Sequence, residues 1–382
     1  MQILTPQNEA EVVDAIIGAA GEGRHLDLQG GGTKADIGAP DRQAGILSLR
    51  ALSGIVDYDP AELVLTARAG TPLAELEQAL AERNQCLAFE PWGDAGSTIG
   101  GIVAAGVSGS RRVSAGAARD YLLGFRAVSG RGESFVAGAK VVKNVTGYDL
   151  PKLMCGSWGR LAALTEVTLK VLPAAPESAT LIWRGLDPAD GWALMSRAMG
   201  LPADVAAAAY LPALSDVASR TLIRLDGFGP SVRARVALLG EAFATVGAAE
   251  RIEGDAARET WRALHGSSIA ADAPLWRISV SARRALAMTR ALEALGGRWI
   301  ADWAGGLVWL ALDGHAQEVR RLAEQAGGHA MLMRAPAAMR AIVPSLHPEQ
   351  RGVAALAQRV RKAFDPSGIF ETGRFPDHSD AN

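Results

Sequence analysis

The sequence is poor in cysteine, with Cys86 and Cys155 as its two among 382 residues. Neither belongs to a CxxC motif or a Cys/His cluster, which excludes a disulfide scaffold and argues against a zinc or iron–sulfur site held by this chain alone. No run of 18 apolar residues without charge is present, and the first residues lack the basic-then-apolar order of a signal peptide. We therefore expect a cytoplasmic protein without a transmembrane segment.

The sequence also has little excess charge and few histidines. A net charge of −2 argues against a general nucleic-acid binder, which needs a basic stripe. The six histidines show no HxH, HxxH or HExxH spacing, so no metal site is predicted; they are His25, His265, His315, His329, His347 and His378. A histidine that stands alone in a strand, as His329 does, is more often structural than catalytic.

Glycine, by contrast, is abundant and unevenly placed. Of the 43 glycines, 14 lie in residues 93–159. Each glycine costs backbone entropy on folding, so this density indicates that the backbone must closely approach something in that part of the chain.

The chain reads as two halves joined by a Pro/Ala linker that begins at Leu172. The first half alternates short strands with helices, expected over 8–20 and 71–83, and a hairpin over 122–128 and 133–137. The second half mixes helices and strands as an α+β layer, one sheet with helices on one face. We predict domains at 1–173, 178–335 and 336–382.

Three glycine-rich stations carry the chemical signal. The first, Gln29 to Lys34 (QGGGTK), follows a strand and suits a nest of N–H groups that binds phosphate, although a tight turn between strands is the alternative. The second, residues 91–109, predicts a short buried helix with Ser97 and Thr98 at its start that could hold a phosphate. Close helix–sheet packing through its glycines and alanines is the alternative. The third, residues 143–159, also reads as a turn and helix cap near Asp149. One long ligand with a diphosphate could touch all three.

These stations, in this order, resemble the FAD-binding domain of the vanillyl-alcohol oxidase (PCMH) type. The motifs KNVTGYDL at 143–150, GSRR at 109–112 and LWRIS at 275–279 are similar to the FAD-binding E subunits of bacterial glycolate oxidase, over nearly the whole chain. The resemblance implies an α+β fold, with a two-subdomain FAD-binding domain, a smaller α+β cap domain and a C-terminal tail that returns to the FAD domain.

The resemblance also implies which residues bind FAD. They would surround its pyrophosphate, isoalloxazine ring and adenine, and are Gly30, Gly31, Gly32, Thr33, Lys34, Pro91, Gly96, Ser97, Thr98, Gly100, Gly101, Gly109, Arg119, Asp120, Lys143, Thr146, Gly147, Thr165, Glu166 and Val167. Neither histidine nor cysteine stands at Gln29 and its neighbours, so FAD should be held noncovalently. The family often has Asn at Gly106 and Asn-Pro-Gly at 371–373, groups that are usually near the flavin ring.

The function implied is that of an FAD-dependent oxidoreductase acting on CH–OH groups, within a complex that oxidises glycolate and other 2-hydroxy acids. The implied partners are a paralogous catalytic FAD subunit and an iron–sulfur subunit, and the complex would place the chain at the cytoplasmic face of the inner membrane. Since a histidine pair is missing, an accessory or electron-relay role is favoured over a stand-alone catalytic dehydrogenase or a related FAD-linked oxidase. Arg277, Arg334 and Arg374 are candidates to meet a carboxylate, but no catalytic residue is assigned.

Overall fold

We describe a computed structural model of the chain, over residues 2–40, 44–93, 95–138, 148–264, 269 and 273–376. The chain divides into two compact units. The first unit comprises Met1–Ser108, Ala117–Ala174 and Pro348–Asn382, and the second comprises Gly109–Gly116 and Ala175–His347. A short stretch of the N-terminal half, 109–116, thus belongs to the second unit.

The first unit contains two main sheets. A parallel sheet has the order β1-β3-β2, and a five-stranded antiparallel sheet has the order β4-β5-β9-β7-β8. The strands are β1 (Ile3–Leu4), β2 (His25–Gln29), β3 (Ala44–Ser48), β4 (Ile55–Asp59), β5 (Val64–Arg68), β7 (Leu122–Ser129), β8 (Ser134–Gly138) and β9 (Ala162–Lys170), with a further pair, β6 (Gln85–Cys86) and β10 (Leu172–Pro173). The helices are α1 (Glu9–Gly21), α2 (Leu73–Ala81), α3 (Ile99–Ala105), η1 (Ala118–Asp120), α5 (Leu150–Met154) and α12 (Arg351–Phe364).

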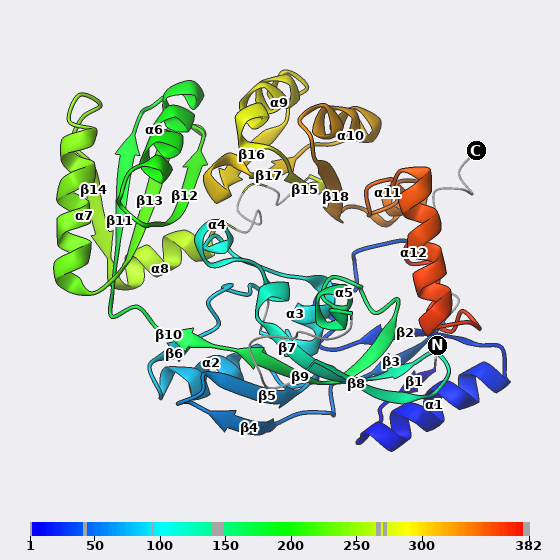
Figure 1. Ribbon diagram of the computed structural model, residues 1–382. Helices are drawn as coiled ribbons and strands as arrows, with labels where there is room; N and C mark the ends of the chain where they lie inside the picture. The colour runs from blue at the N-terminus through cyan, green and yellow to red at the C-terminus, as the bar shows by residue number, and fades with distance from the viewer. Residues whose placement is uncertain are drawn as a thin grey trace. The chain divides into compact units, whose positions relative to one another are not determined.

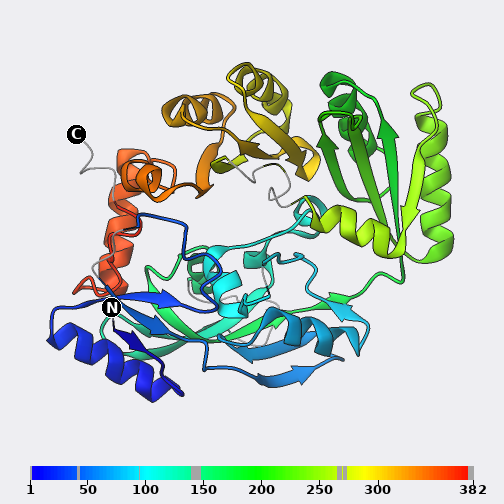
Figure 2. The same ribbon diagram turned by 180° about the vertical axis from the view of Figure 1, so that it is seen from behind.

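Helix α1 follows from local sequence. Asn8 caps it by accepting a hydrogen bond from the Glu11 backbone N–H, and its buried residues Val12, Ile16 and Ala19 recur at helical spacing. These side chains pack into one core with strand residues such as Leu26. The helix therefore lies along the small parallel sheet, as Figure 2 shows.

The C-terminal tail belongs to the same core as α1. Asp365, which is buried, accepts hydrogen bonds from the backbone N–H groups of Ile369 (2.9 Å) and Phe370 (2.8 Å). The Ile369 carbonyl then accepts from the Leu26 N–H on β2 at 2.8 Å. Because the Asp365 carboxylate accepts hydrogen bonds from these two backbone N–H groups, the apolar side chains of the tail can be buried beside β2.

The second unit is built on one eight-stranded sheet with the order β14-β11-β13-β12-β16-β17-β15-β18. Its strands are β11 (Glu177–Arg184), β12 (Val205–Leu211), β13 (Arg220–Gly227), β14 (Glu250–Glu253), β15 (Leu275–Ser279), β16 (Arg298–Asp302), β17 (Leu307–Ala311) and β18 (His329–Arg334). Its helices are α4 (Arg112–Ala115), α6 (Pro188–Gly200), α7 (Gly229–Ala242), α8 (Gly254–Arg262), α9 (Ala282–Ala294), η3 (Trp303–Gly305), α10 (Ala316–Gln325) and α11 (Ala337–Ile342).

The main core of the second unit lies on one face of its sheet. Residues of α6, α7, α9 and α10, among them Met195, Leu239, Leu292 and Leu322, pack there against alternate strand residues (Figure 1). The opposite face carries α4 and α8; Trp261 of α8 donates to the Thr180 hydroxyl at 2.9 Å. The expected single sheet is present, and its main helices share one face.

Candidate functional site: a cofactor cavity in the first unit

A cavity lies in the first unit, between the turn after β2 and the start of α3. The lining comprises residues 28–35, Leu49, Ala69, Ser97, Thr98, Gly100, Gly101, Ile102, Ala104, Ala105, Trp158, Gly159, Ala162, Leu164 and Arg374. The cavity brings together the first predicted station, residues 29–34, and the core of the second.

The turn after β2 requires glycine because two backbones touch there. A Cβ added to Gly31 would lie 1.6 Å from the carbonyl oxygen of Gly96, and one added to Gly30 would lie 2.2 Å from the Thr98 hydroxyl. Gly32 has φ +72°, a left-handed conformation that suits glycine. The turn and the segment before α3 are therefore pressed together, as the glycine density indicates.

The turn also presents unused hydrogen-bond donors. None of the described residues accepts a hydrogen bond from the backbone N–H groups of Gly30, Gly31 and Gly32. Successive N–H groups of this kind form a concave nest that binds anionic oxygens such as those of a diphosphate. The arrangement fits the interpretation of QGGGTK as a phosphate-binding turn better than that of a plain tight turn.

The second station supports the turn from the side of α3. Thr98 caps this helix, its hydroxyl accepting from the Gly101 N–H at 3.4 Å, and the Ser97 hydroxyl lies 3.1 Å from that of Thr33. Both Ser97 and Thr98 are buried. The short helix predicted within residues 91–109 is thus present, and a hydroxyl pair connects its start to the glycine turn.

Arg374, one of the three arginines that could meet a carboxylate, binds backbone carbonyls at the end of the glycine turn instead. Its Nε donates to the Ile37 carbonyl at 2.9 Å, and its Nη2 donates to the Lys34 carbonyl. Its Nη1 lies 3.6 Å from the Asp27 carboxylate, and its guanidinium carbon lies 5.8 Å from the centre of the Trp158 ring. The tail thereby braces the far end of the glycine turn. The contact joins residues 340 positions apart, so no local sequence signal could reveal it.

Several predicted cofactor residues do not line this cavity. Gly109 lies in the second unit, and Arg119 and Asp120 are largely exposed and 4.0 Å apart. Val167 is buried in the strand β9. The other described residues outside the lining are Pro91, Gly96, Thr165 and Glu166, while Lys143, Thr146 and Gly147 lie outside the described residues. The part of all these residues in cofactor binding stays a prediction.

Two positions that depart from the family pattern, Gly106 and Glu371, lie in the first unit and have structural roles there. Gly106 ends α3 with φ +64°, a conformation that asparagine also tolerates. Glu371 forms an ion pair with Arg361 at 2.9 Å.

In the third station, residues 143–159, the helix cap given as the alternative is observed. The Asp149 carboxylate accepts a hydrogen bond from the Lys152 N–H at 3.3 Å.

The second unit brings two histidines together that their spacing in the sequence does not reveal. The ring centres of His329 and His347 are 6.4 Å apart. However, Nδ1 of His347 accepts from the Ala330 N–H at 3.3 Å, and its Nε2 lies 3.2 Å from a Glu324 carboxylate oxygen. Both ring nitrogens of His347 are therefore engaged, which leaves no lone pair for a metal ion. The described residues contain no cluster of three or more potential metal ligands.

The chain resembles known proteins both over most of its length and in its first half alone. A family model described as an FAD binding domain matches residues 2–138. The glycolate oxidase subunit GlcE of Escherichia coli is 35% identical over 354 residues, which cover 91% of this chain and 92% of the relative. A D-lactate dehydrogenase of Anaerostipes hadrus is 32% identical over 183 residues, but these cover 47% of this chain and 38% of the enzyme.

Solved structures of alkyldihydroxyacetonephosphate synthase share the fold. One has a TM-score of 0.68 at 15% identity, over 97% of this chain and 76% of that one. Among the described residues, no helix is both long and apolar enough to cross a membrane. The predicted PCMH-type fold with a further α+β domain is confirmed, as is FAD as the cofactor. This chain belongs to the GlcE family of FAD-linked glycolate oxidase subunits.

Proposed function

We propose that this chain holds FAD noncovalently in the cavity of the first unit and serves as a subunit of a glycolate oxidase complex. The complex would oxidise glycolate to glyoxylate, with other 2-hydroxy acids as related substrates. The match to GlcE over nine-tenths of both chains supports the assignment. A paralogous FAD subunit would be one partner, since the glycolate oxidase subunit GlcD of Bacillus subtilis is 29% identical over 182 residues. An iron–sulfur subunit, implied by the resemblance, would complete a cytoplasmic complex.

The residues of the cavity suit noncovalent binding. The N–H groups of Gly30, Gly31 and Gly32 would hold the diphosphate, and the Lys34 ammonium, 5.4 Å from the centre of the Trp92 ring, adds positive charge nearby. No histidine or cysteine stands among the described lining residues, so none of them can form a flavin bond of the usual kind. When bound, FAD supplies the two-electron chemistry, and the protein supplies position and charge.

The accessory or electron-relay role rests on one observation. Oxidation of a 2-hydroxy acid needs a group that accepts the hydroxyl proton. Among the described lining residues, the ionisable side chains are those of Lys34 and Arg374, and Arg374 is held by backbone carbonyls. Neither is a histidine or a carboxylate, the side chains that most often accept such a proton. We therefore infer that substrate is oxidised on the paralogous subunit and that this flavin relays electrons.

Anaerobic titration of the purified chain with glycolate tests this role. The chain should release FAD on denaturation, and its flavin should stay oxidised when glycolate is added without partners. Dithionite should still reduce the flavin, which controls for a damaged cofactor. In the reconstituted complex, glycolate should reduce this flavin as well. Full bleaching of the isolated chain would instead favour the alternative, a stand-alone catalytic 2-hydroxy-acid dehydrogenase.

A further inference from the structure

The strand that leads into the glycine turn ends in a polar side chain to which the proposed function gives no role. Gln29 is the last residue of β2 and directly precedes the three glycines. β2 is an edge strand of the small parallel sheet, and its Leu26 packs into the core with α1. Because side chains alternate along a strand, Asp27 and Gln29 share the opposite face. Gln29 is half-buried and belongs to the lining of the cofactor cavity.

The orientation of the Gln29 carboxamide is set by a carboxylate. Its Nε2 donates a hydrogen bond to the Asp27 carboxylate at 3.1 Å. An ionised carboxylate only accepts hydrogen bonds, so the NH₂ end of the amide must face Asp27 and the oxygen must face away from it. Asp27 is itself held in place, since it is buried and its carboxylate lies 3.6 Å from Nη1 of Arg374. A series of contacts that begins in the C-terminal tail therefore decides which atom Gln29 presents.

The Oε1 atom of Gln29 is thus a hydrogen-bond acceptor beside the glycine turn. A Cβ added to Gly32 would lie 3.9 Å from it. None of the described residues donates a hydrogen bond to this oxygen. Among the side chains of the described lining, it is also the only polar oxygen that accepts without being able to donate, because the others are hydroxyls. The cavity therefore offers one acceptor at the edge of a group of donors.

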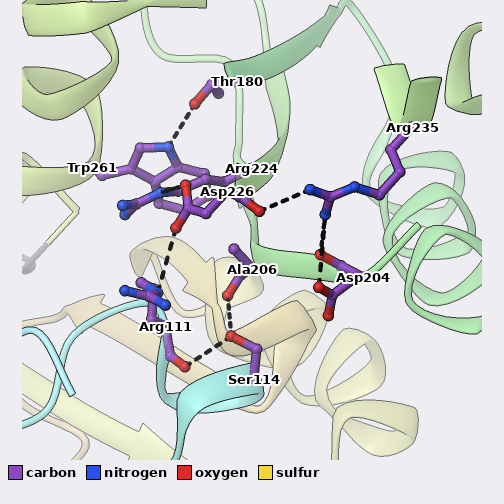
Figure 3. A network of polar contacts seen from close by, with 9 residues as sticks. All are labelled: Arg111, Ser114, Thr180, Asp204, Ala206, Arg224, Asp226, Arg235 and Trp261. Atoms are coloured by element: carbon purple, nitrogen blue, oxygen red, sulfur yellow. Dashed lines mark hydrogen bonds and ion pairs between the residues drawn. The ribbon is translucent and has the colours of Figure 1, made fainter. Parts of the chain in front are cut away.

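A polar network of the second unit shows the more usual arrangement, in which partners come from the protein (Figure 3). The Ser114 hydroxyl donates to the Ala206 carbonyl at 2.7 Å. Trp261 Nε1 donates to the Thr180 hydroxyl at 2.9 Å. Such pairing is the rule for polar groups inside proteins. The Gln29 oxygen differs because no described residue pairs with it and because it adjoins a cavity, where a ligand can supply the donor.

The place of this oxygen decides which group of a ligand suits it. The N–H groups of Gly30, Gly31 and Gly32 favour the anionic oxygens of a diphosphate. A carboxamide oxygen repels such oxygens, so it requires a donor that lies next to the diphosphate. In FAD the donors nearest to the diphosphate are sugar hydroxyls, on the ribose at one side and on the ribityl chain at the other. The N–H groups of the adenine and flavin rings lie beyond these sugars.

We propose that Gln29 is a specificity-determining residue of the cavity, whose Oε1 accepts a hydrogen bond from a sugar hydroxyl of FAD beside the diphosphate. The inference rests on the proposed place of FAD in this cavity. Asp27 is the positioning residue, because it holds the NH₂ end of the carboxamide and so keeps the oxygen available. The amide is oriented before the cofactor arrives, which lowers the entropy cost of binding. A ligand that lacks the hydroxyl leaves the oxygen without a partner and loses affinity.

Binding of FAD analogues to the cofactor-free chain tests this role. The probes are FAD and analogues that each lack one hydroxyl, either of the ribose or of the ribityl chain, and fluorescence titration measures their affinities. One analogue should bind the wild type about three- to tenfold more weakly than FAD, since one neutral hydrogen bond is lost. The identity of that analogue shows which sugar carries the donor. Gln29→Met, which keeps the length of the side chain but lacks the carboxamide, should bind FAD and that analogue equally.

Gln78→Met, the same change at an exposed position of α2, is the matched control and should distinguish the two ligands as the wild type does. Gln29→Asn, which draws the amide oxygen back, should lose the distinction and takes the place of Gln29→Met if that variant does not fold. The inference is refuted if every analogue binds the wild type as tightly as FAD does. It is also refuted if Gln29→Met weakens both ligands by the same factor, because that result shows a structural role. A wild type that binds no FAD would overturn the proposed function as well.

Discussion

Gly31→Ala tests the inference that the turn after β2 is a phosphate-binding nest pressed against the start of α3. The new Cβ would lie 1.6 Å from the Gly96 carbonyl oxygen and 2.6 Å from its carbon. Both atoms belong to the backbone, so no side chain can rotate away. The two segments must separate by more than an ångström, which moves the N–H groups of the turn away from the diphosphate.

The expected magnitude has two parts. Forcing one extra methyl into a tight contact costs typically about 1–3 kcal/mol of stability. Each lost hydrogen bond to a charged oxygen costs about 1.5–3 kcal/mol of binding energy, so FAD affinity should fall at least about tenfold. Urea unfolding of the cofactor-free chain measures the first quantity, and titration of the apoprotein by flavin fluorescence measures the second.

Two glycines serve as controls for Gly31→Ala. A Cβ on Gly18, in the exposed middle of α1, meets nothing within 4 Å, so Gly18→Ala should stabilise the chain by about 0.5–1 kcal/mol. Gly32→Ala introduces no close contact but requires a left-handed alanine, a cost of roughly 1–2 kcal/mol. If Gly31→Ala unfolded at the same urea concentration as the wild type and bound FAD equally well, the close contact and the nest would both be wrong.

Two further changes probe the first unit. Arg374→Lys keeps the charge but loses the guanidinium that binds the Lys34 and Ile37 carbonyls. The free energy of unfolding in urea should fall by about 1–2 kcal/mol, and FAD should bind several-fold more weakly. An unchanged FAD affinity would show that the tail does not brace the turn. Burial alone would raise the pKa of Glu9, but hydrogen bonds led by that from Arg126 lower it overall. Glu9→Gln should therefore lower the free energy of unfolding by about 1 kcal/mol at pH 7. The difference from the wild type should shrink below about pH 4 as the wild-type carboxylate protonates. A difference at pH 3 as large as that at pH 7 would contradict this.

The parts of the fold with strong local signals could be predicted from the sequence. The helix expected at 8–20 is observed as Glu9–Gly21, and the hairpin expected at 122–128 and 133–137 is observed as β7 and β8. Periodicity and turn residues act over a few positions, so they are visible without a structure. The strand β14 was not expected, because the exposed sequence ERIE at 250–253 has no apolar alternation and forms only as an edge strand.

The sequence predicts the glycines of the cavity but not the distant residues that hold them in place. QGGGTK predicts a phosphate-binding turn from local sequence, with a tight turn between strands as the alternative. Arg374 could not be distinguished from 32 other arginines, because its role depends on a tail that packs against β2. Likewise, no local signal predicts that residues 109–116 are held in the second unit by pairs such as Ser110 with Asp302. Contacts between distant segments depend on topology, which no local pattern records.

The glycine density of residues 93–159 therefore has several causes. A Cβ on Gly100 would lie 2.6 Å from that of Ala69, so this glycine lets α3 pack closely beside the cavity. Gly130 is pressed instead against Asp365, whose carboxylate would lie 2.2 Å from an added Cβ and which holds the C-terminal tail. The tail in turn carries the arginine that braces the glycine turn after β2. Gly100 and Gly130 thus both mark places where backbone is approached closely, and only the partner at each place separates cofactor binding from the packing that supports it.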